Sequence, residues 1–234
     1  MTTIAVALQA VRERIAKAAR AANRPEKDIT LLAISKGKPV EAIREAYRNG
    51  QRAFGESYLQ EALPKLAALH DLPIEWHFVG PIQSNKTRDI AGHFSWVHGV
   101  DRGKIAQRLS GLRAGDLRAL QICLQVNVSG ETSKHGVGAS SLRALADSVR
   151  KLPGLQLRGL MAIPAAAGDD ALQHRQYKTM RSLMDELNRD GFGLDTLSMG
   201  MSRDIEAAIA EGATMLRVGS AIFGERTRTG QARQ

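Results

Sequence analysis

Residues 29–50 read ITLLAISKGKPVEAIREAYRNG and contain one complete strand-then-helix unit. The run at 29–35 is largely apolar, which is typical of a strand covered on both faces. Pro39 suits the start of a helix, and Gly50 suits the position just after its end. We therefore predict a buried strand over 29–35 and a helix from Pro39 to about Asn49.

The alternation of strand and helix continues along the rest of the chain. Further strands are predicted at 52–55, 74–79, 94–97, 120–128, 155–160, 196–198 and 214–218. Helices are predicted at 57–69, from 84, at 101–113, 140–151, 170–189 and 202–211, and from 219. Alternation of this kind favours a parallel sheet, and eight units in 234 residues favour a closed barrel. A doubly wound open sheet is the alternative.

We predict an α/β protein made of a single-domain (β/α)₈ TIM barrel with an extra N-terminal helix. That helix covers about 3–22, where apolar residues recur at helical spacing. The barrel domain is expected over 1–226, with the N-terminal helix inside 1–24. Residues 227–234 are expected to form a basic tail outside the fold.

Composition and charge argue against several classes of protein. The hydrophobic content of 43% and the charged content of 24% are ordinary for a soluble globular domain. No apolar run is long enough to span a bilayer, and the N-terminus lacks the apolar segment of a secretion signal. The net charge of +9 is spread among acidic residues, and aromatics reach only 4%, which argues against a nucleic-acid site. Cys123 is the only cysteine, so no internal disulfide can form, and we expect a cytoplasmic protein.

Two glycine–serine segments follow the last two predicted strands. Gly200-Met201-Ser202 precedes one predicted helix, and Gly219-Ser220 precedes another. Helix N-termini present free N–H groups and partial positive charge to an anion, while glycine lets the backbone approach. Barrels commonly bind phosphate after strands seven and eight. Either segment alone is explained by an ordinary turn, but the two together predict a phosphate site.

Lys36 follows the first predicted strand, across the barrel mouth from these segments. An apolar strand behind a lysine desolvates the amine, which lowers its pKa and favours the nucleophilic form. A lone lysine at a barrel rim is more often a solvated surface residue. Lys38, two residues further on, would lie on the same face of the strand and is the other candidate for the nucleophilic amine. Its place before Pro39 puts it nearer the surface.

His77, near the end of a predicted strand, is a further candidate for lining a ligand. His77 fits three roles: a base, a ring-stacking partner, or a core histidine with satisfied hydrogen bonds, of which the last is favoured. No cluster of histidine, cysteine and carboxylate has metal-ligand spacing. The chain also lacks a P-loop, a dinucleotide fingerprint and a nucleophile elbow.

Nine short segments carry a resemblance to a known family. They are AISKGKP at 33–39, FGESY at 54–58, WHFVG at 76–80, QSNK at 83–86, NVSGE at 127–131, SKHG at 133–136, GLM at 159–161, LSMGMS at 197–202 and RVGSAIFG at 217–224. These segments resemble the pyridoxal phosphate homeostasis protein family. They cover nearly the whole chain in order, so together they are highly specific.

The resemblance implies a fold-type III barrel for pyridoxal 5′-phosphate (PLP), related to the N-terminal domain of alanine racemases. It implies a Schiff base between PLP and Lys36, phosphate contacts from Ser202, Gly219 and Ser220, and a contact from Arg217 to the pyridine nitrogen. The expected cofactor-binding residues also include Ser57, His77, Met161 and Gly200.

The chain departs from the family pattern at two positions. The family usually has asparagine where this chain has Ser57, and it usually has no proline where this chain has Pro81. The first change bears on a side-chain contact near the cofactor, and the second bears on the rim loop. Neither affects Lys36 or the glycine–serine segments.

These features predict a PLP carrier and regulator in intracellular PLP (vitamin B6) homeostasis, not an enzyme. Arginine only donates hydrogen bonds, so a ring nitrogen at Arg217 stays unprotonated and the ring is a weaker electron sink. A racemase also needs a second acid or base, for which Tyr58 and His77 are the candidates. The chain ends soon after the last strand, so the additional racemase β-domain is not expected.

A weak PLP-dependent amino-acid racemase is the alternative function. The expected partners are PLP and PLP-dependent apo-enzymes, with neither nucleic acid nor a membrane, and a monomer is expected.

Overall fold

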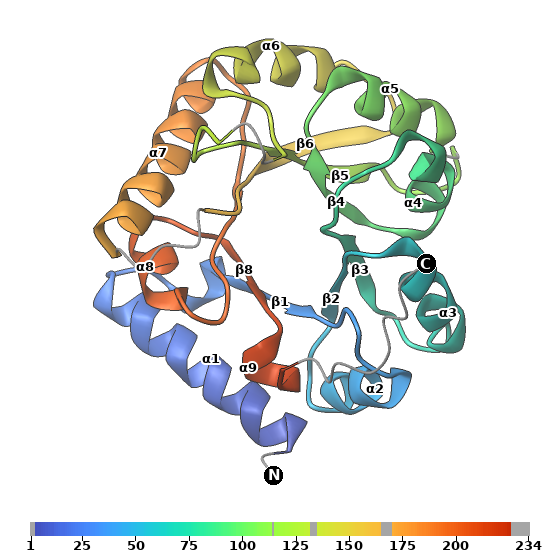
Figure 1. Ribbon diagram of the computed structural model, residues 1–234, viewed down its shortest axis with the longest axis vertical. Coiled ribbons are helices and arrows are strands. Elements are labelled where there is room, and N and C mark those ends of the chain that lie inside the picture. The colour runs from blue at the N-terminus through green and yellow to red at the C-terminus, as the bar shows by residue number, and fades with distance from the viewer. Residues whose placement is uncertain (1–2, 114, 132–134, 165–169, 226–234) are drawn as a thin grey trace.

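A computed structural model describes residues 3–113, 115–131, 135–164 and 170–225. Eight parallel strands pair in chain order, and β1 pairs with β8, so the sheet closes into a barrel (Figure 1). The strands are β1 Thr30–Ile34, β2 Ala53–Glu56, β3 Glu75–Phe78, β4 Trp96–Val100, β5 Leu120–Gln125, β6 Leu155–Met161, β7 Thr196–Ser198 and β8 Met215–Val218. The predicted barrel is confirmed, and the alternative prediction of a doubly wound open sheet is wrong.

Helices form a ring around the barrel (Figure 1). They are α1 Ile4–Ala21, α2 Val40–Arg48, α3 Leu59–Ala68, α4 Thr87–His93, α5 Gly103–Leu112, α6 Ala139–Val149, α7 Asp170–Arg189, α8 Ile205–Ala210 and α9 Ser220–Phe223, with short 3₁₀ turns at Glu26–Asp28 and Ser84–Lys86. None of the helices in the described part of the chain is long and apolar enough to cross a membrane. The predicted tail at 227–234 lies outside the described residues, as does most of the loop after Pro164.

The extra helix α1 completes the ring where the last helices are short. It begins at Thr3, whose hydroxyl accepts a hydrogen bond from the Val6 N–H at 3.3 Å. Its apolar stripe, which includes Leu8, Val11 and Ile15, is buried. The helix packs against α8, α9 and α2, and Figure 1 shows it running alongside α8 and α9. The segment that precedes the first strand therefore forms part of the outer layer of helices.

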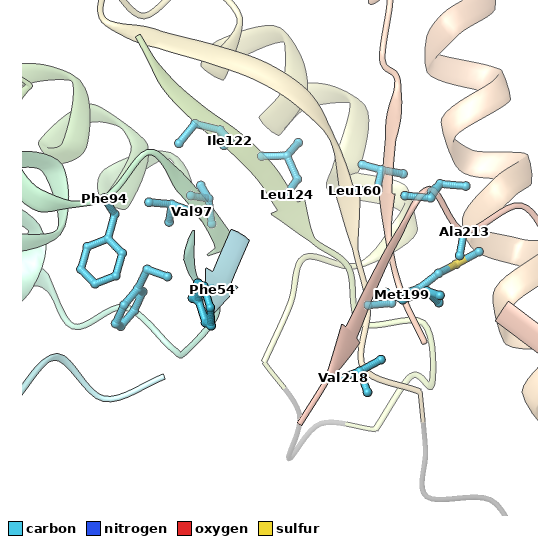
Figure 2. Close-up of a cluster of buried hydrophobic side chains, with 14 of the residues drawn as sticks. Phe54, Phe94, Val97, Ile122, Leu124, Leu160, Met199, Ala213 and Val218 are labelled. Atoms are coloured by element: carbon cyan, nitrogen blue, oxygen red, sulfur yellow. The ribbon is translucent and has the colours of Figure 1, made fainter. Parts of the chain in front are cut away.

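Apolar side chains fill two separate regions. The larger cluster lies between the strands and the helices, and Figure 2 shows part of it, including Phe54, Val97 and Leu160. The smaller cluster lies inside the barrel and comprises Leu32, Ile34, Ala53, Trp96, Cys123, Met161 and Met215, with Val79 packed against it. Successive strand residues point to opposite faces, so one strand supplies both regions.

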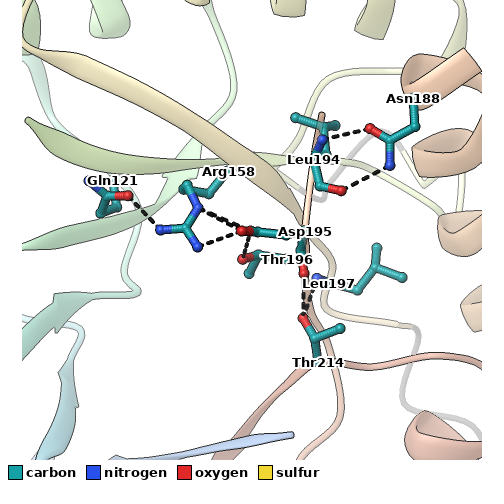
Figure 3. Close-up of polar contacts among 8 residues, drawn as sticks. All are labelled: Gln121, Arg158, Asn188, Leu194, Asp195, Thr196, Leu197 and Thr214. Atoms are coloured by element: carbon teal, nitrogen blue, oxygen red, sulfur yellow. Dashed lines mark hydrogen bonds and ion pairs between the residues drawn. The ribbon is translucent and has the colours of Figure 1, made fainter. Parts of the chain in front are cut away.

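Polar groups gather around the beginnings of β7 and β8 (Figure 3). Arg158 donates to both carboxylate oxygens of Asp195, at 2.6–3.1 Å, and to the Gln121 side chain at 2.7 Å. Its guanidinium carbon lies 5.0 Å from the centre of the Trp96 ring. These contacts join β5, β6 and β7 at the end of the barrel opposite the predicted site.

Three predicted helix starts are wrong for local reasons. The helix predicted from Ser57 begins only at Leu59, as α3, and has no side-chain cap. The helix predicted from Asp101 begins only at Gly103, as α5, and the Asp101 side chain binds the Arg102 guanidinium at 2.6 Å. Ser202 does not open α8, because the Asp204 carboxylate accepts the Met201 N–H at 2.5 Å and closes a turn ahead of the helix.

Several strand boundaries differ from the prediction by one or two residues, and the ends of β4 and β5 differ by three. β4 begins at Trp96 and extends to Val100, beyond the predicted end at Val97. β5 ends at Gln125, before the predicted end at Val128. The longer β4 brings His98 into the barrel wall, which matters for the site.

Gly159 is required where β6 approaches β7. A Cβ at this position would lie 1.8 Å from the Thr196 carbonyl oxygen, a backbone atom that cannot move aside. We expect Gly159→Ala to lower the free energy of unfolding, measured in urea, by about 3 kcal/mol or more. Gly111→Ala in α5 is the control, since no described atom outside its own helix backbone and chain neighbours lies within 4 Å of its added Cβ, and a gain of about 0.5–1 kcal/mol is expected. Equal stabilities of the two variants would contradict this account.

Candidate functional site

Lys36 lies at the carboxyl-end mouth of the barrel, just beyond β1. Leu32 and Ile34 point into the barrel, and Lys36 continues the same alternation two residues further on. Its side chain is partly buried. Gly37 then adopts a φ of +70° and its N–H donates to Glu61 at 2.9 Å, so the chain turns away directly after the lysine. This is the predicted position of the anchor.

Lys38 is directed elsewhere. Its amine donates to the carbonyl oxygens of Phe223, at 2.8 Å, and Glu225, at 2.9 Å. Lys38 therefore ties the loop after β1 to the end of α9. The structure favours Lys36 over its rival as the lysine that faces the mouth.

A buried polar cluster lies directly behind Lys36. Ser35 donates its hydroxyl to Glu56 Oε1 at 2.6 Å, and the Lys65 amine contacts the same oxygen at 2.8 Å and the Ser35 carbonyl at 2.9 Å. Burial raises the pKa of the Glu56 carboxyl, and the hydrogen bond from Lys65 opposes that rise. Among the described residues, Glu56 Oε2 has no hydrogen-bond partner. The cluster joins β1, β2 and α3 immediately before the lysine.

The two glycine–serine segments meet as predicted. The Ser202 hydroxyl accepts the Ala221 N–H at 3.3 Å, which links the turn after β7 to the first turn of α9. Gly200 has a φ of +92°, a conformation that favours glycine, and a Cβ there would lie 2.5 Å from the Ala208 Cβ. A Cβ at Gly219 would lie 3.2 Å from the Ile34 carbonyl oxygen. Gly219 is therefore next to the strand that carries Lys36.

Asp204 and Arg14 hold the turn that carries Ser202. Asp204 accepts from the Tyr177 hydroxyl at 2.8 Å and from Gln173 at 2.9 Å, in addition to the Met201 N–H. Burial, together with the Asp204 charge, raises the pKa of Tyr177, so it stays a donor. Arg14 of α1 donates to the Ser202 carbonyl at 2.7 Å. Both supporting residues were missed by the sequence analysis, since neither lies at a predicted strand end.

Arg217 of β8 carries a fully buried guanidinium. Its Nη1 donates to the Ser198 carbonyl at 2.5 Å and to the Ser198 hydroxyl at 2.8 Å, and its Nη2 donates to the Ala162 carbonyl at 2.8 Å. Burial lowers its pKa, yet an arginine remains charged in a protein. Three of the five N–H donors of a guanidinium are thus bound, and among the described residues no acceptor is recorded for the other two, which suit a ligand. Met161, which precedes Ala162, is buried inside the barrel.

His77 is fully buried, and both of its ring nitrogens bind protein groups. Nε2 lies 2.8 Å from Glu75 Oε1, and Nδ1 lies 3.0 Å from His98 Nε2. The ring also stacks on Trp96 with 5.4 Å between the ring centres. Of the three roles left open, this geometry is that of a core histidine with satisfied hydrogen bonds. A direct contact of His77 or the partly buried Ser57 with a cofactor stays a prediction.

His98 was missed, because the predicted fourth strand ended before it. Its Nδ1 lies 2.8 Å from the Ser198 hydroxyl, so it connects His77 to the serine that holds Arg217. Burial lowers the pKa of His77, and burial together with the charges of His77 and Arg217 lowers the pKa of His98 well below its usual value. The alternation from Trp96 to His98 along one strand was the signal that could have found it.

No metal site competes with this arrangement. Within the described ranges, no group of three or more histidine, cysteine or acidic residues could hold a metal ion. Burial raises the pKa of the Cys123 thiol inside the barrel to about 12, so this cysteine is unreactive. Within the described residues, the mouth therefore combines the Lys36 amine with a glycine–serine cradle and a buried guanidinium.

The two buried histidines predict a pH dependence of stability. Their pKa values lie below 6.5 in the folded state, so unfolding takes up protons as the pH falls below that value. The free energy of unfolding should be highest above about pH 7 and fall at lower pH by about 1.4 kcal/mol per pH unit for each histidine. The free energy of unfolding is measured in urea at several pH values between about pH 8 and pH 5. His98→Gln should remove about half of its dependence on pH.

His93→Gln is the matched control, since His93 is exposed on α4. It should leave the slope unchanged. A slope in His98→Gln equal to that of the unaltered protein would show that His98 does not resist protonation.

Comparisons with known proteins agree with this geometry. A family model described as alanine racemase, N-terminal domain, matches residues 6–227. A Pseudomonas aeruginosa protein named pyridoxal phosphate homeostasis protein is 58% identical over 226 residues, which cover 97% of each chain. PipY of Synechococcus elongatus, solved with PLP bound, has a TM-score of 0.83 and 40% identity, covering 95% of this chain and all of its own.

The alanine racemase of Bacillus anthracis shares the fold alone. Its TM-score is 0.69 at 18% identity, and the match covers 97% of this chain but 58% of the racemase. The resemblance found in the nine sequence segments is thereby confirmed by relatives that align over nearly their full length. The chain belongs to the pyridoxal phosphate homeostasis protein family.

Proposed function

We propose that this protein binds PLP at the barrel mouth through Lys36 and acts in PLP homeostasis as a carrier and regulator. The observation that carries the proposal is the position of Gly219, where an added Cβ would lie 3.2 Å from the Ile34 carbonyl. Gly219 therefore lies beside the end of β1, two residues before Lys36, which supports an anion site next to this amine. The family name of the relatives and the PLP bound to PipY support the same ligand.

The residues present fit the chemical groups of PLP. The cradle offers the hydroxyls of Ser202 and Ser220 and the backbone of Gly200 and Gly219 to a phosphate. The buried Arg217 has donors left for the ring nitrogen, which is an acceptor when unprotonated. Bound PLP supplies an aldehyde, which forms a C=N bond to a lysine amine with loss of water and can pass to another amine.

Arg217 favours holding PLP over carbanion chemistry. A guanidinium donates to the ring nitrogen and does not protonate it, so the ring draws electrons less strongly than a protonated one. The surrounding carbonyl oxygens of Ser198 and Ala162 keep this donor in place. We therefore propose a non-catalytic role.

The candidates for a second acid or base support the same proposal. Both ring nitrogens of His77 bind Glu75 and His98, so this side chain offers neither nitrogen to a substrate. Tyr58 is half exposed at the start of α3. Turnover of D- or L-alanine or serine that Lys36→Ala abolishes would favour the alternative, a weak racemase.

Lys36→Ala tests the anchor. The purified protein with PLP should show a visible-range absorbance, and borohydride should fix PLP on Lys36 by reducing the C=N bond. We expect Lys36→Ala to lose both signals, because the amine proposed as the anchor is gone, and Lys104→Ala on the exposed face of α5 to keep them. Mapping of the reduced adduct to Lys38 would assign the anchor to the rival lysine.

Transfer of PLP to an apo-enzyme tests the carrier role. We expect the loaded protein to restore activity to a PLP-dependent apo-enzyme while a PLP phosphatase destroys the cofactor free in solution. If the protein instead releases PLP into solution, the phosphatase should abolish the restoration of apo-enzyme activity. That result would mean that the protein buffers PLP and does not deliver it. The comparison uses the loaded protein and free PLP at equal concentration.

A further inference from the structure

A chain of hydrogen bonds runs through the barrel to Arg217. It starts at Glu75, the first residue of β3, whose side chain is half exposed, and passes through His77 of β3 and His98 of β4. It then reaches Ser198 of β7 and ends at the Arg217 guanidinium of β8. The successive donor–acceptor distances are 2.8, 3.0, 2.8 and 2.8 Å. Apart from Arg217, none of these side chains is among the groups proposed above to hold the phosphate or the ring nitrogen of PLP.

The hydrogen positions follow from the Arg217 end. An arginine can only donate, so the Ser198 hydroxyl oxygen accepts from Nη1. The single hydroxyl hydrogen of Ser198 then has His98 Nδ1 as its acceptor at 2.8 Å. His98 therefore carries its hydrogen on Nε2, which points at His77 Nδ1.

The Glu75 end gives the same direction independently. An ionised carboxylate only accepts, and the hydrogen bond with His77 lowers the pKa of Glu75. His77 therefore donates from Nε2, and a neutral His77 accepts at Nδ1 from His98. The Arg217 end thus requires neutral histidines with the hydrogen on Nε2, and the Glu75 end requires the same hydrogen on His77. Every donor in the chain points from Arg217 towards Glu75.

Protonation of either histidine would break this order. A doubly protonated His98 would donate from Nδ1 to Ser198, and the serine hydrogen would lose its acceptor. The charged groups around the histidines are Arg217 beside Ser198, Glu75, and Arg158 over the Trp96 ring that stacks on His77. Full burial of both rings acts against protonation as well.

We propose that His77, His98 and Ser198 are positioning residues, which orient Arg217 so that its remaining donors select a ligand ring with an acceptor nitrogen. The guanidinium also donates to the carbonyl oxygens of Ser198 and Ala162, which are backbone atoms. The Ser198 hydroxyl is therefore the hydrogen-bond partner that a substitution can remove. The choice of ligand rests on the proposed binding of PLP, whereas the hydrogen positions do not depend on it.

Nitrogen NMR of the protein without ligand tests the hydrogen positions. With ¹⁵N-labelled histidine at about pH 7.5, two rings assigned to His77 and His98 should be neutral and protonated on Nε2. Glu75→Gln keeps an acceptor oxygen and should preserve both states, whereas Glu75→Leu removes it and should release the preference of His77. An Nδ1-protonated or doubly protonated ring at either position would overturn the proposal.

Ligand affinity tests the positioning role. Dissociation constants are measured for PLP and for an analogue in which carbon replaces the ring nitrogen, with the unaltered protein, Ser198→Ala and Ser198→Thr. The unaltered protein should prefer PLP, and Ser198→Ala should lose about tenfold of this preference, which corresponds to one hydrogen bond to a charged group. Ser198→Thr retains the hydroxyl and should restore the preference.

The outcomes separate this inference from the proposed function. A general loss of structure in Ser198→Ala would weaken both ligands equally, and this result would overturn the positioning role. Ser148→Ala on α6, whose hydroxyl donates to the Leu145 carbonyl away from Arg217, is the matched control and should change neither affinity. If the unaltered protein bound neither ligand, the proposed function would fail while the NMR result would still stand.

Discussion

The pairing of β1 with β8 closes the barrel, and the arrangement of the mouth depends on it. The register places Leu32 opposite Arg217 and Ala33 opposite Val218, so the first and last strands end side by side. Lys36 follows one strand and Gly219 follows the other. Because parallel strands all end at the same rim, closure alone brings the amine, the cradle and the guanidinium from opposite ends of the chain to one opening.

Closure also creates an interior that must be filled. Barrels of this kind usually fill it with branched apolar side chains. Here part of the interior is apolar, but the buried polar side chains of His77, His98, Ser198 and Arg217 share it. A buried charge is costly unless hydrogen bonds surround it, and Arg217 has three such bonds within the protein. The polar interior is therefore the condition for placing a permanent cation beneath the mouth.

The outer helices support the mouth from behind. Arg14 of α1 binds the Ser202 carbonyl, and Asp204 closes the turn that carries this serine. The Lys38 amine joins the loop after β1 to the end of α9. The contacts of Arg14, Asp204 and Lys38 thus hold the side of the rim that we propose for the phosphate. The two helices in that region, α8 and α9, are short.

Local patterns were sufficient for the eight strand–helix units, the extra helix, the place of Lys36 and the two glycine–serine segments. Apolar runs, helical spacing and glycine are properties of neighbouring residues, so the sequence by itself determined them, and Gly200 does adopt the positive φ that such a turn requires. Only the tertiary structure decided which side chains meet. Local patterns predict helix starts at Ser57, Asp101 and Ser202, but these helices begin two or three residues later. The Asp101 side chain binds Arg102, and Asp204 closes the turn that carries Ser202. The contact of His98 with Ser198 joins strands far apart in the chain, and no local periodicity can encode a hydrogen bond that forms only when the barrel closes.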